Sequence, residues 1–218
     1  YTQYAEHFGW WTLPALVLGG MYLGVFTATE AAAAGALGAL AIAGLVYRNL
    51  GLRDVWDSAI DAARSSAMLF LILAAAALLG HALTKLRIPA QMVELVTQYG
   101  LTQVGFLLAL MVLIFVLGMF LETISIILIT TPVVLPVLAA LDINPVWYGV
   151  LLTINLELAL ITPPVGMNLF AIKAVARAPM SEIIMGVLPY VGLLVFGLAL
   201  VLLFPSIALW LPSTMSYK

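Results

Sequence analysis

Long apolar stretches separated by short polar segments make up most of the 218-residue chain. Several stretches hold about 20 predominantly apolar residues, which is the length that an α-helix needs to cross a bilayer. They lack the alternation of apolar and polar positions that is typical of a transmembrane β-barrel. The pattern therefore predicts an all-α integral membrane protein, a polytopic helical bundle embedded in the lipid bilayer. In chain order we expect a polar lead (1–9), transmembrane helices broken near Thr27 (10–47), a connector with an interfacial helix (48–64), a transmembrane helix (65–84), an interfacial arm helix (85–100), a re-entrant hairpin (101–141), a broken transmembrane helix (146–176) and a terminal transmembrane helix (181–211).

The first apolar region is too long for one crossing. A continuous helix from Leu13 to Tyr47 would measure about 52 Å, whereas the hydrocarbon core is about 30 Å thick. Thr27 and Glu30 have the spacing of a capping box, in which each side chain bonds a free backbone N–H at the start of a helix. We therefore expect Glu30 to be a helix cap near a membrane surface. The alternative is that Glu30 touches a polar path through the membrane.

Residues 101–141 are too many for one crossing and too few for two complete crossings with a loop. Residues 118–123 interrupt the centre of this region, and Pro132 and Pro136 interrupt its second half. We interpret it as a re-entrant hairpin with its tip inside the membrane, where non-helical backbone needs a cover of protein or a water-filled cavity. The alternative is two tilted crossings with Glu122 in an ordinary loop.

The span 146–176 carries a second interruption at its middle, the sequence Thr-Pro-Pro-Val-Gly at 162–166. Neither proline has a backbone N–H, so a continuous helix cannot pass through them. Carbonyl groups without a partner in hydrocarbon cost several kcal/mol each. Neighbouring helices, trapped water or a bound ion must satisfy them. We favour a binding site here over a proline kink that adjacent helices repair.

Composition narrows the class of protein. Hydrophobic residues make up 65% of the chain and charged residues 8%, whereas a soluble domain has roughly 25% charged residues. No basic cluster suggests a nucleic-acid partner, and the lack of cysteine excludes disulfides, thiolate metal sites and cysteine nucleophiles. The chain begins at Tyr1 without a signal peptide. We therefore expect a fragment, or one half of a larger protein.

The basic residues orient the predicted helices. Five of them fall on one side of the layout and three on the other, so the first side is expected to be cytoplasmic. The hairpin side and the C-terminus would then face outside. The first group is Arg48, Arg53, Arg64, Lys173 and Arg177, and the second is Lys85, Arg87 and Lys218.

A hairpin tip and a broken helix that meet near the midplane would bring four half-helix ends together. Free N–H groups at helix starts suit a carboxylate, and unwound carbonyls with hydroxyls suit a hard ion such as Na⁺, as in secondary transporters built from inverted repeats. The candidate residues for binding substrate and ion are Gly118, Glu122, Thr123, Ser125, Asn155, Thr162, Pro163, Pro164, Val165, Gly166 and Asn168. Na⁺ is expected near Glu122, Thr123, Thr162, Pro163 and Gly166, and no organic cofactor is expected.

Three of the polar residues in these spans leave alternatives open. Glu122 would be an anionic ligand at the tip. Glu157 is an acid inside a predicted span and so a functional candidate by default, with a buried, protonated or Asn-bonded side chain as the alternative. Asn155 and Asn168 can either bridge helices by hydrogen bonds or offer carbonyl oxygens to an ion.

Four motifs occur in a fixed order along the chain: GMYLGVFTATEAAA at 20–33, GMFLE at 118–122, NLELALITPPVGMNLF at 155–170 and FPSIALWLP at 204–212. Together they resemble the C-terminal half of the large membrane subunit of tripartite ATP-independent periplasmic (TRAP) transporters. The resemblance implies an elevator-type, Na⁺-coupled importer of organic acids (carboxylates) in the bacterial inner membrane, with the hairpin side and the C-terminus in the periplasm. It implies three partners: a small four-helix membrane subunit, a periplasmic substrate-binding protein, and the missing first-repeat half of the large subunit.

Within that family, residues 118–123 are similar to the second hairpin tip and residues 162–166 to the break that faces it. Glu122 departs from the family, which commonly has Asp at this position. A non-transporting membrane scaffold or channel-like subunit is the alternative function. An intramembrane hydrolase with Glu122 and Glu157 as paired acids would need a nucleophile motif or a metal-ligand cluster, and neither is present in the sequence. We therefore do not expect an enzyme.

Overall fold

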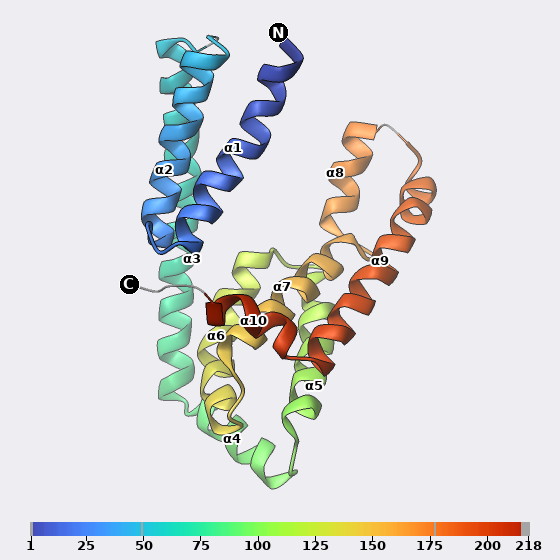
Figure 1. Cartoon of the computed structure of the whole chain (residues 1–218). Coiled ribbons are helices and arrows are strands. Elements are labelled where there is room, and N and C mark those ends of the chain that lie inside the picture. The colour runs from blue at the N-terminus through green and yellow to red at the C-terminus, as the bar shows by residue number, and fades with distance from the viewer. Residues whose placement is uncertain (1, 49, 177, 215–218) are drawn as a thin grey trace. The chain divides into compact units, whose positions relative to one another are not determined.

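The computed structural model describes residues 2–48, 50–176 and 178–214, with side chains from residue 11 onward (Figure 1). Helices are the regular structure of these residues, which contain no strand, and this confirms the all-α class. Four helical segments are long and apolar enough to cross a membrane: 28–46, 52–85, 123–140 and 180–203. The helices are α1 (Thr2–Tyr22), α2 (Ala28–Ala41) continued by the π-helix η1 (Ile42–Val46), α3 (Leu52–Lys85), α4 (Ile88–Gln98), α5 (Gln103–Gly118), α6 (Thr123–Ala140), α7 (Pro145–Ile161), α8 (Met167–Ala176), α9 (Met180–Leu203) and α10 (Ser206–Thr214).

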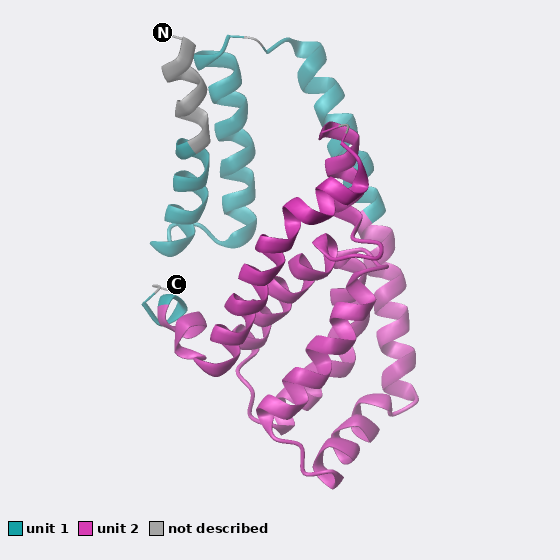
Figure 2. Cartoon of the chain, turned by 90° about the vertical axis from the view of Figure 1, so that its right-hand side faces the viewer, with its two compact units in different colours: residues 1–68, 211–218 teal, residues 69–210 magenta. Residues whose placement is uncertain are grey.

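The chain forms two compact units, residues 1–68 with 211–218 and residues 69–210 (Figure 2). In the first unit α1 packs against α2. The predicted break at Thr27 is confirmed, because both halves of the capping box form there. Glu30 N donates to Thr27 Oγ1 at 3.3 Å, and Thr27 N donates to the Glu30 carboxylate at 2.8 Å. Glu30 is therefore a helix cap.

Two boundaries predicted from the sequence are wrong. The expected interfacial helix at 48–64 and the transmembrane helix at 65–84 are one 34-residue helix, α3, because no glycine or proline occurs between Leu52 and Gly80. At 1.5 Å per residue α3 is about 51 Å long. The expected crossing at 181–211 is divided into α9 and α10, because Pro205 lacks an N–H and keeps Phe204 out of the helical region (φ −124°, ψ 79°). Residues 2–9 of the expected polar lead form the start of α1.

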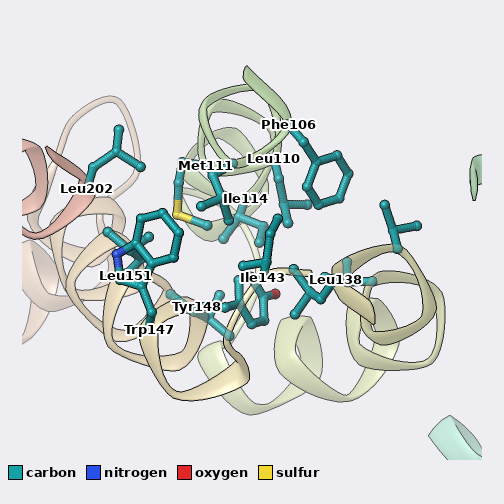
Figure 3. Close-up of a cluster of buried hydrophobic side chains, with 14 of the residues drawn as sticks. Phe106, Leu110, Met111, Ile114, Leu138, Ile143, Trp147, Tyr148, Leu151 and Leu202 are labelled. Atoms are coloured by element: carbon teal, nitrogen blue, oxygen red, sulfur yellow. The ribbon is translucent and has the colours of Figure 1, made fainter. Parts of the chain in front are cut away.

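The second unit is built around α7, which packs between α5 and α9. Trp147 Nε1 on α7 donates to Val201 O on α9 at 2.8 Å. Side chains of α5, α6, α7 and α9 share one apolar core (Figure 3). This core includes Phe106, Leu107, Leu110, Met111, Ile114, Ile126, Val134, Val137, Leu138, Ile143, Trp147, Tyr148, Leu151, Leu152 and Leu156.

Helices α5 and α6 form the predicted hairpin as separate helices joined by residues 119–122. At the base of the hairpin, Gln103 Nε2 at the start of α5 donates to Leu141 O just after α6, at 3.0 Å. Helix α5 has 16 residues, fewer than the roughly 20 residues of a full crossing, whereas α6 has 18 and is long enough to cross. The re-entrant interpretation therefore stays a prediction. The expected arm helix is present as α4.

Candidate functional site

The tip of the hairpin packs against the last turns of α7. Gly118, the final residue of α5, is buried there. A Cβ atom on Gly118 would lie 2.7 Å from Ala159 Cβ and 3.7 Å from a methyl group of Leu156, both on α7. Real Cβ atoms do not come closer than 3.0 Å, and the Ala159 Cβ is fixed to its own helix. Glycine is therefore required at the tip, and the hairpin meets α7 as the sequence predicted.

Glu122 uses its carboxylate on the helix that it begins. As the N-cap of α6 it accepts hydrogen bonds from Ser125 N at 3.1 Å and from Ser125 Oγ at 3.2 Å. Its negative charge also lies at the positive end of the α6 dipole. Thr123 is the first residue of α6 and is half-buried. The structure therefore brings Glu122, Thr123 and Ser125 together at the tip.

The predicted break in the span 146–176 is confirmed. Helix α7 ends at Ile161 and α8 begins at Met167. Thr162 has extended backbone (φ −98°, ψ 131°), and it closes α7 with two hydrogen bonds. Its N–H donates to Ala159 O at 3.3 Å, and its hydroxyl donates to Leu158 O at 2.6 Å. Thr162 therefore satisfies two of the last carbonyls of α7.

Two further carbonyls at the break converge on Gly166. This glycine has φ +49°, and a Cβ atom on it would lie 2.9 Å from Thr162 O and 3.1 Å from Leu160 O. The helical donor to Leu160 O would be residue 164, which is a proline without an N–H. Within the described residues, no backbone N–H donates to Leu160 O or to Thr162 O. Both oxygens are therefore available to a ligand.

Asn155 fixes α7 to α5. It is 2% exposed, and its Nδ2 donates to Met111 O on α5 at 2.9 Å. It lies seven residues before Thr162, about two helical turns from the break. Of the two roles that the sequence left open, bridging between helices is the one that these contacts support.

The other predicted site residues lie around the break without a common focus. Pro163 and Val165 are half-buried, whereas Pro164 and Asn168 are exposed. Glu157 is also exposed, so the alternative of a buried Glu157 is wrong. It falls one turn after Thr153, which is also exposed. The structure does not bring Glu157 and the hairpin tip into one site.

Sequence reasoning did not select three residues that shape the site. Ala159 and Leu156 receive the hairpin tip, and Leu160 supplies a backbone carbonyl. An apolar side chain gives no chemical signal in a sequence. Every residue has a backbone carbonyl, so a carbonyl that acts as a ligand cannot be recognised from residue type. The small size of Ala159, three residues before the break, is the one signal that could have shown a close contact with another helix.

The carbonyl and hydroxyl oxygens at the break are the kind of ligand that suits a hard monovalent cation. Nowhere in the described part of the chain do three His, Cys, Asp or Glu side chains come together in a way that could hold a metal ion. A cation here would depend on the free carbonyls Leu160 O and Thr162 O and on the Thr162 hydroxyl, which keeps its acceptor capacity while it donates to Leu158 O. Unwound carbonyls of this kind coordinate Na⁺ in secondary transporters.

A helical membrane bundle in which a hairpin tip packs beside a broken helix has the architecture of one repeat of a secondary transporter. Sequence comparison narrows this class to a family. The family described as "Tripartite ATP-independent periplasmic transporter, DctM component" matches residues 3–207. The chain belongs to this family, and the resemblance drawn from the four motifs is confirmed.

Individual relatives agree with this assignment. The chain is 34% identical to the C4-dicarboxylate TRAP transporter large permease protein of Vibrio cholerae over 221 residues, covering 92% of this chain and 49% of the relative. It is 37% identical to the protein of the same description in Pseudomonas aeruginosa over 201 residues, covering 92% and 47%. It is 34% identical to the ectoine TRAP transporter large permease protein of Halomonas elongata over 198 residues, covering 91% and 46%. The chain spans about half the length of these curated relatives, which are permeases and not enzymes.

Proposed function

We propose that this chain works as the second-repeat half of a TRAP transporter large subunit, and that it contributes an ion site to the Na⁺-coupled import of an organic acid. The observation that carries the proposal is the meeting of the Gly118 tip with the last turn of α7. This contact lies three residues before a break where two free carbonyls converge on Gly166. Backbone carbonyls without hydrogen-bond partners are costly in a membrane. A bound Na⁺ would satisfy both oxygens.

The half-length of the chain limits what it can do alone. A transporter site built from two repeats needs the second hairpin and the second broken helix, which we expect from the first-repeat half. A periplasmic binding protein would deliver the substrate, and a small four-helix membrane subunit would complete the assembly in the inner membrane. C4-dicarboxylate and ectoine, the substrates in the names of the relatives, support an organic acid as cargo. The hairpin side would face the periplasm.

The test uses the complete assembly in proteoliposomes with an imposed Na⁺ gradient. Thr162→Val removes the hydroxyl at the break but keeps the size of the side chain. We expect it to raise the Na⁺ concentration for half-maximal uptake by at least 5-fold. Thr153→Val is the matched control, because the Thr153 hydroxyl also donates within α7, to Gly149 O at 2.9 Å, but lies on the exposed face away from the break.

Equal Na⁺ dependence in the two variants would refute the ion site at the break. A scaffold or channel-like role makes a different prediction, since neither variant would then change Na⁺ dependence and transport would not follow the Na⁺ gradient. Uptake that collapses equally on Thr153→Val would show a general loss of folding. Uptake by the wild-type assembly that follows the Na⁺ gradient tests the proposed function, whereas the Thr162→Val variant tests the assigned residue.

A further inference from the structure

Two apolar cavities in the second unit share a wall and form one groove. The first, of about 340 Å³, lies between α4 and α5. The second, of about 210 Å³, lies between α5 and α6 and shares Met92, Phe106, Leu110 and Leu113 with the first. We call these connected cavities the arm groove.

The groove exists because the two helices of the hairpin are joined at their ends. Near the tip, Gly118 of α5 faces Ile126 of α6, and at the base Gln103 bonds the carbonyl after α6. Between these points, Phe106 and Leu110 extend from the side of α5 that is turned toward α6 (Figure 3). The arm helix α4 covers only part of the opening.

The lining of the groove offers few polar groups to a ligand. Thr130 and Tyr99 are the polar side chains that border it. The Thr130 hydroxyl already donates to Ile126 O at 2.8 Å, and Tyr99 is 75% exposed. A polar molecule inside this space would lose most of its hydrogen bonds to water. An alkyl chain fits the same surface without that cost.

Two cations lie where the groove reaches the end of α3. Leu83 borders the second cavity, and Lys85 and Arg87 follow it by two and four residues, at the junction of α3 and α4. Both are exposed, and neither forms an ion pair with any part of the chain that the structure describes. Basic residues at the end of an apolar span lie at the level of lipid phosphates and attract anionic headgroups.

The acidic residue nearest in sequence on the arm helix does not oppose this charge. Helix α4 turns Met92, Leu95, Val96 and Tyr99 toward the groove. Glu94 is exposed and falls about 200° around the helix from Met92, on the other side. The groove therefore joins an apolar channel to a cationic end. This arrangement is complementary to a phospholipid, which has apolar tails and an anionic headgroup.

We propose that the arm groove binds an acyl chain of an anionic phospholipid, whose phosphate group lies beside Lys85 and Arg87. The bound chain would fill the space between the arm helix and the two helices of the hairpin. This binding is separate from ion and substrate transport, because the groove wall near Phe106 and Met92 is at the base of the hairpin rather than at its tip.

The test is native mass spectrometry of the full chain, purified in detergent with equal amounts of phosphatidylglycerol and phosphatidylethanolamine. Leu113→Trp places an indole in the groove and is expected to reduce the bound phosphatidylglycerol at least 10-fold. Leu108→Trp is the matched control, since Leu108 is 50% exposed and Leu113 is 54% exposed on the same helix, but Leu108 does not border the groove. Retained phosphatidylglycerol in Leu113→Trp would overturn the proposal.

A second variant avoids any change in packing. Lys85→Gln with Arg87→Gln is expected to abolish the preference for phosphatidylglycerol over phosphatidylethanolamine, whereas Arg53→Gln, an exposed cation at the start of α3, should leave it unchanged. An unchanged preference in the double variant would overturn the role of the two cations. A protein dimer that forms without lipid and is lost in Leu113→Trp would show that a second copy covers the groove, which would also overturn the proposal.

Discussion

Replacing Gly118 with alanine tests whether a close backbone contact holds the hairpin tip against α7. The added methyl group would lie 2.7 Å from Ala159 Cβ, so one of the two helices must move. Both atoms are attached directly to helix backbones and cannot rotate away. The contact with Leu156 at 3.7 Å is an ordinary one and adds no strain. The effect should therefore come from the Ala159 methyl group alone.

The expected size follows from two opposing terms. Forcing an extra methyl into a packed contact costs about 1–3 kcal/mol, while alanine in place of glycine in a helix gains up to about 1 kcal/mol. Gly149→Ala in α7 is the control for the second term, because a Cβ atom there meets nothing within 4 Å. We expect Gly149→Ala to be neutral or stabilising. Gly118→Ala should be about 1–3 kcal/mol less stable than this control.

A double-mutant cycle identifies the contact. Ala159→Gly removes the methyl group that Gly118→Ala meets, so the double variant should recover about 1–2 kcal/mol relative to the sum of the single changes. The measurement is reversible unfolding of the purified chain in detergent micelles, followed by circular dichroism. Additivity within about 0.5 kcal/mol is the behaviour of independent sites. That result would refute the close packing of the tip on α7.

Three further substitutions test other parts of the second and first units. Asn155→Leu should lower the free energy of unfolding by about 0.5–1.5 kcal/mol, because it removes the bond to Met111 O, and an unchanged unfolding midpoint would exclude the bridging role. Thr27→Ala removes a cap and should cost about 0.5–2 kcal/mol, measured as a loss of hydrogen-exchange protection at the start of α2; equal protection would contradict the capping box. Gly166→Ala forces a side chain into the left-handed region, at a cost of roughly 1–2 kcal/mol, and against the two free carbonyls. It should abolish Na⁺-driven uptake in the complete assembly while Gly149→Ala retains it, and equal uptake would show that the break does not bind the ion.

Interruptions of helices were predictable from the sequence because each has a local cause. Thr27 with Glu30 marks a helix start, and the prolines at 163 and 164 prevent a continuous helix whatever surrounds them. Pro205 carries the same kind of signal, but the apolar pattern continues across it and predicts one uninterrupted crossing. The division of 48–85 into two helices was wrong for the opposite reason. A change from polar to apolar residues changes the environment of a helix but does not end it.

Contacts between distant segments were predictable only in outline. The sequence placed the hairpin tip beside the break, and the structure brings Gly118 to Ala159. It could not show which residues of α7 receive the tip, since Ala159 and Leu156 resemble many other apolar positions in this chain. The direction of a side chain was equally beyond the sequence. Asn155 and Glu157 are two residues apart, yet one is buried against α5 and the other is exposed.

The capping of α6 by Glu122 bears on which ligand, the substrate carboxylate or the Na⁺ ion, the hairpin tip would bind. The N-terminal end of α6 was a candidate for binding a substrate carboxylate, because its free N–H groups and dipole favour an anion. The Glu122 carboxylate already lies there and bonds Ser125. A second carboxylate would meet a like charge, whereas a cation would be attracted. Under the proposed function, this half of the large subunit would contribute mainly to the ion, through Leu160 O and Thr162 O, and groups outside this chain would hold most of the negative charge of the substrate.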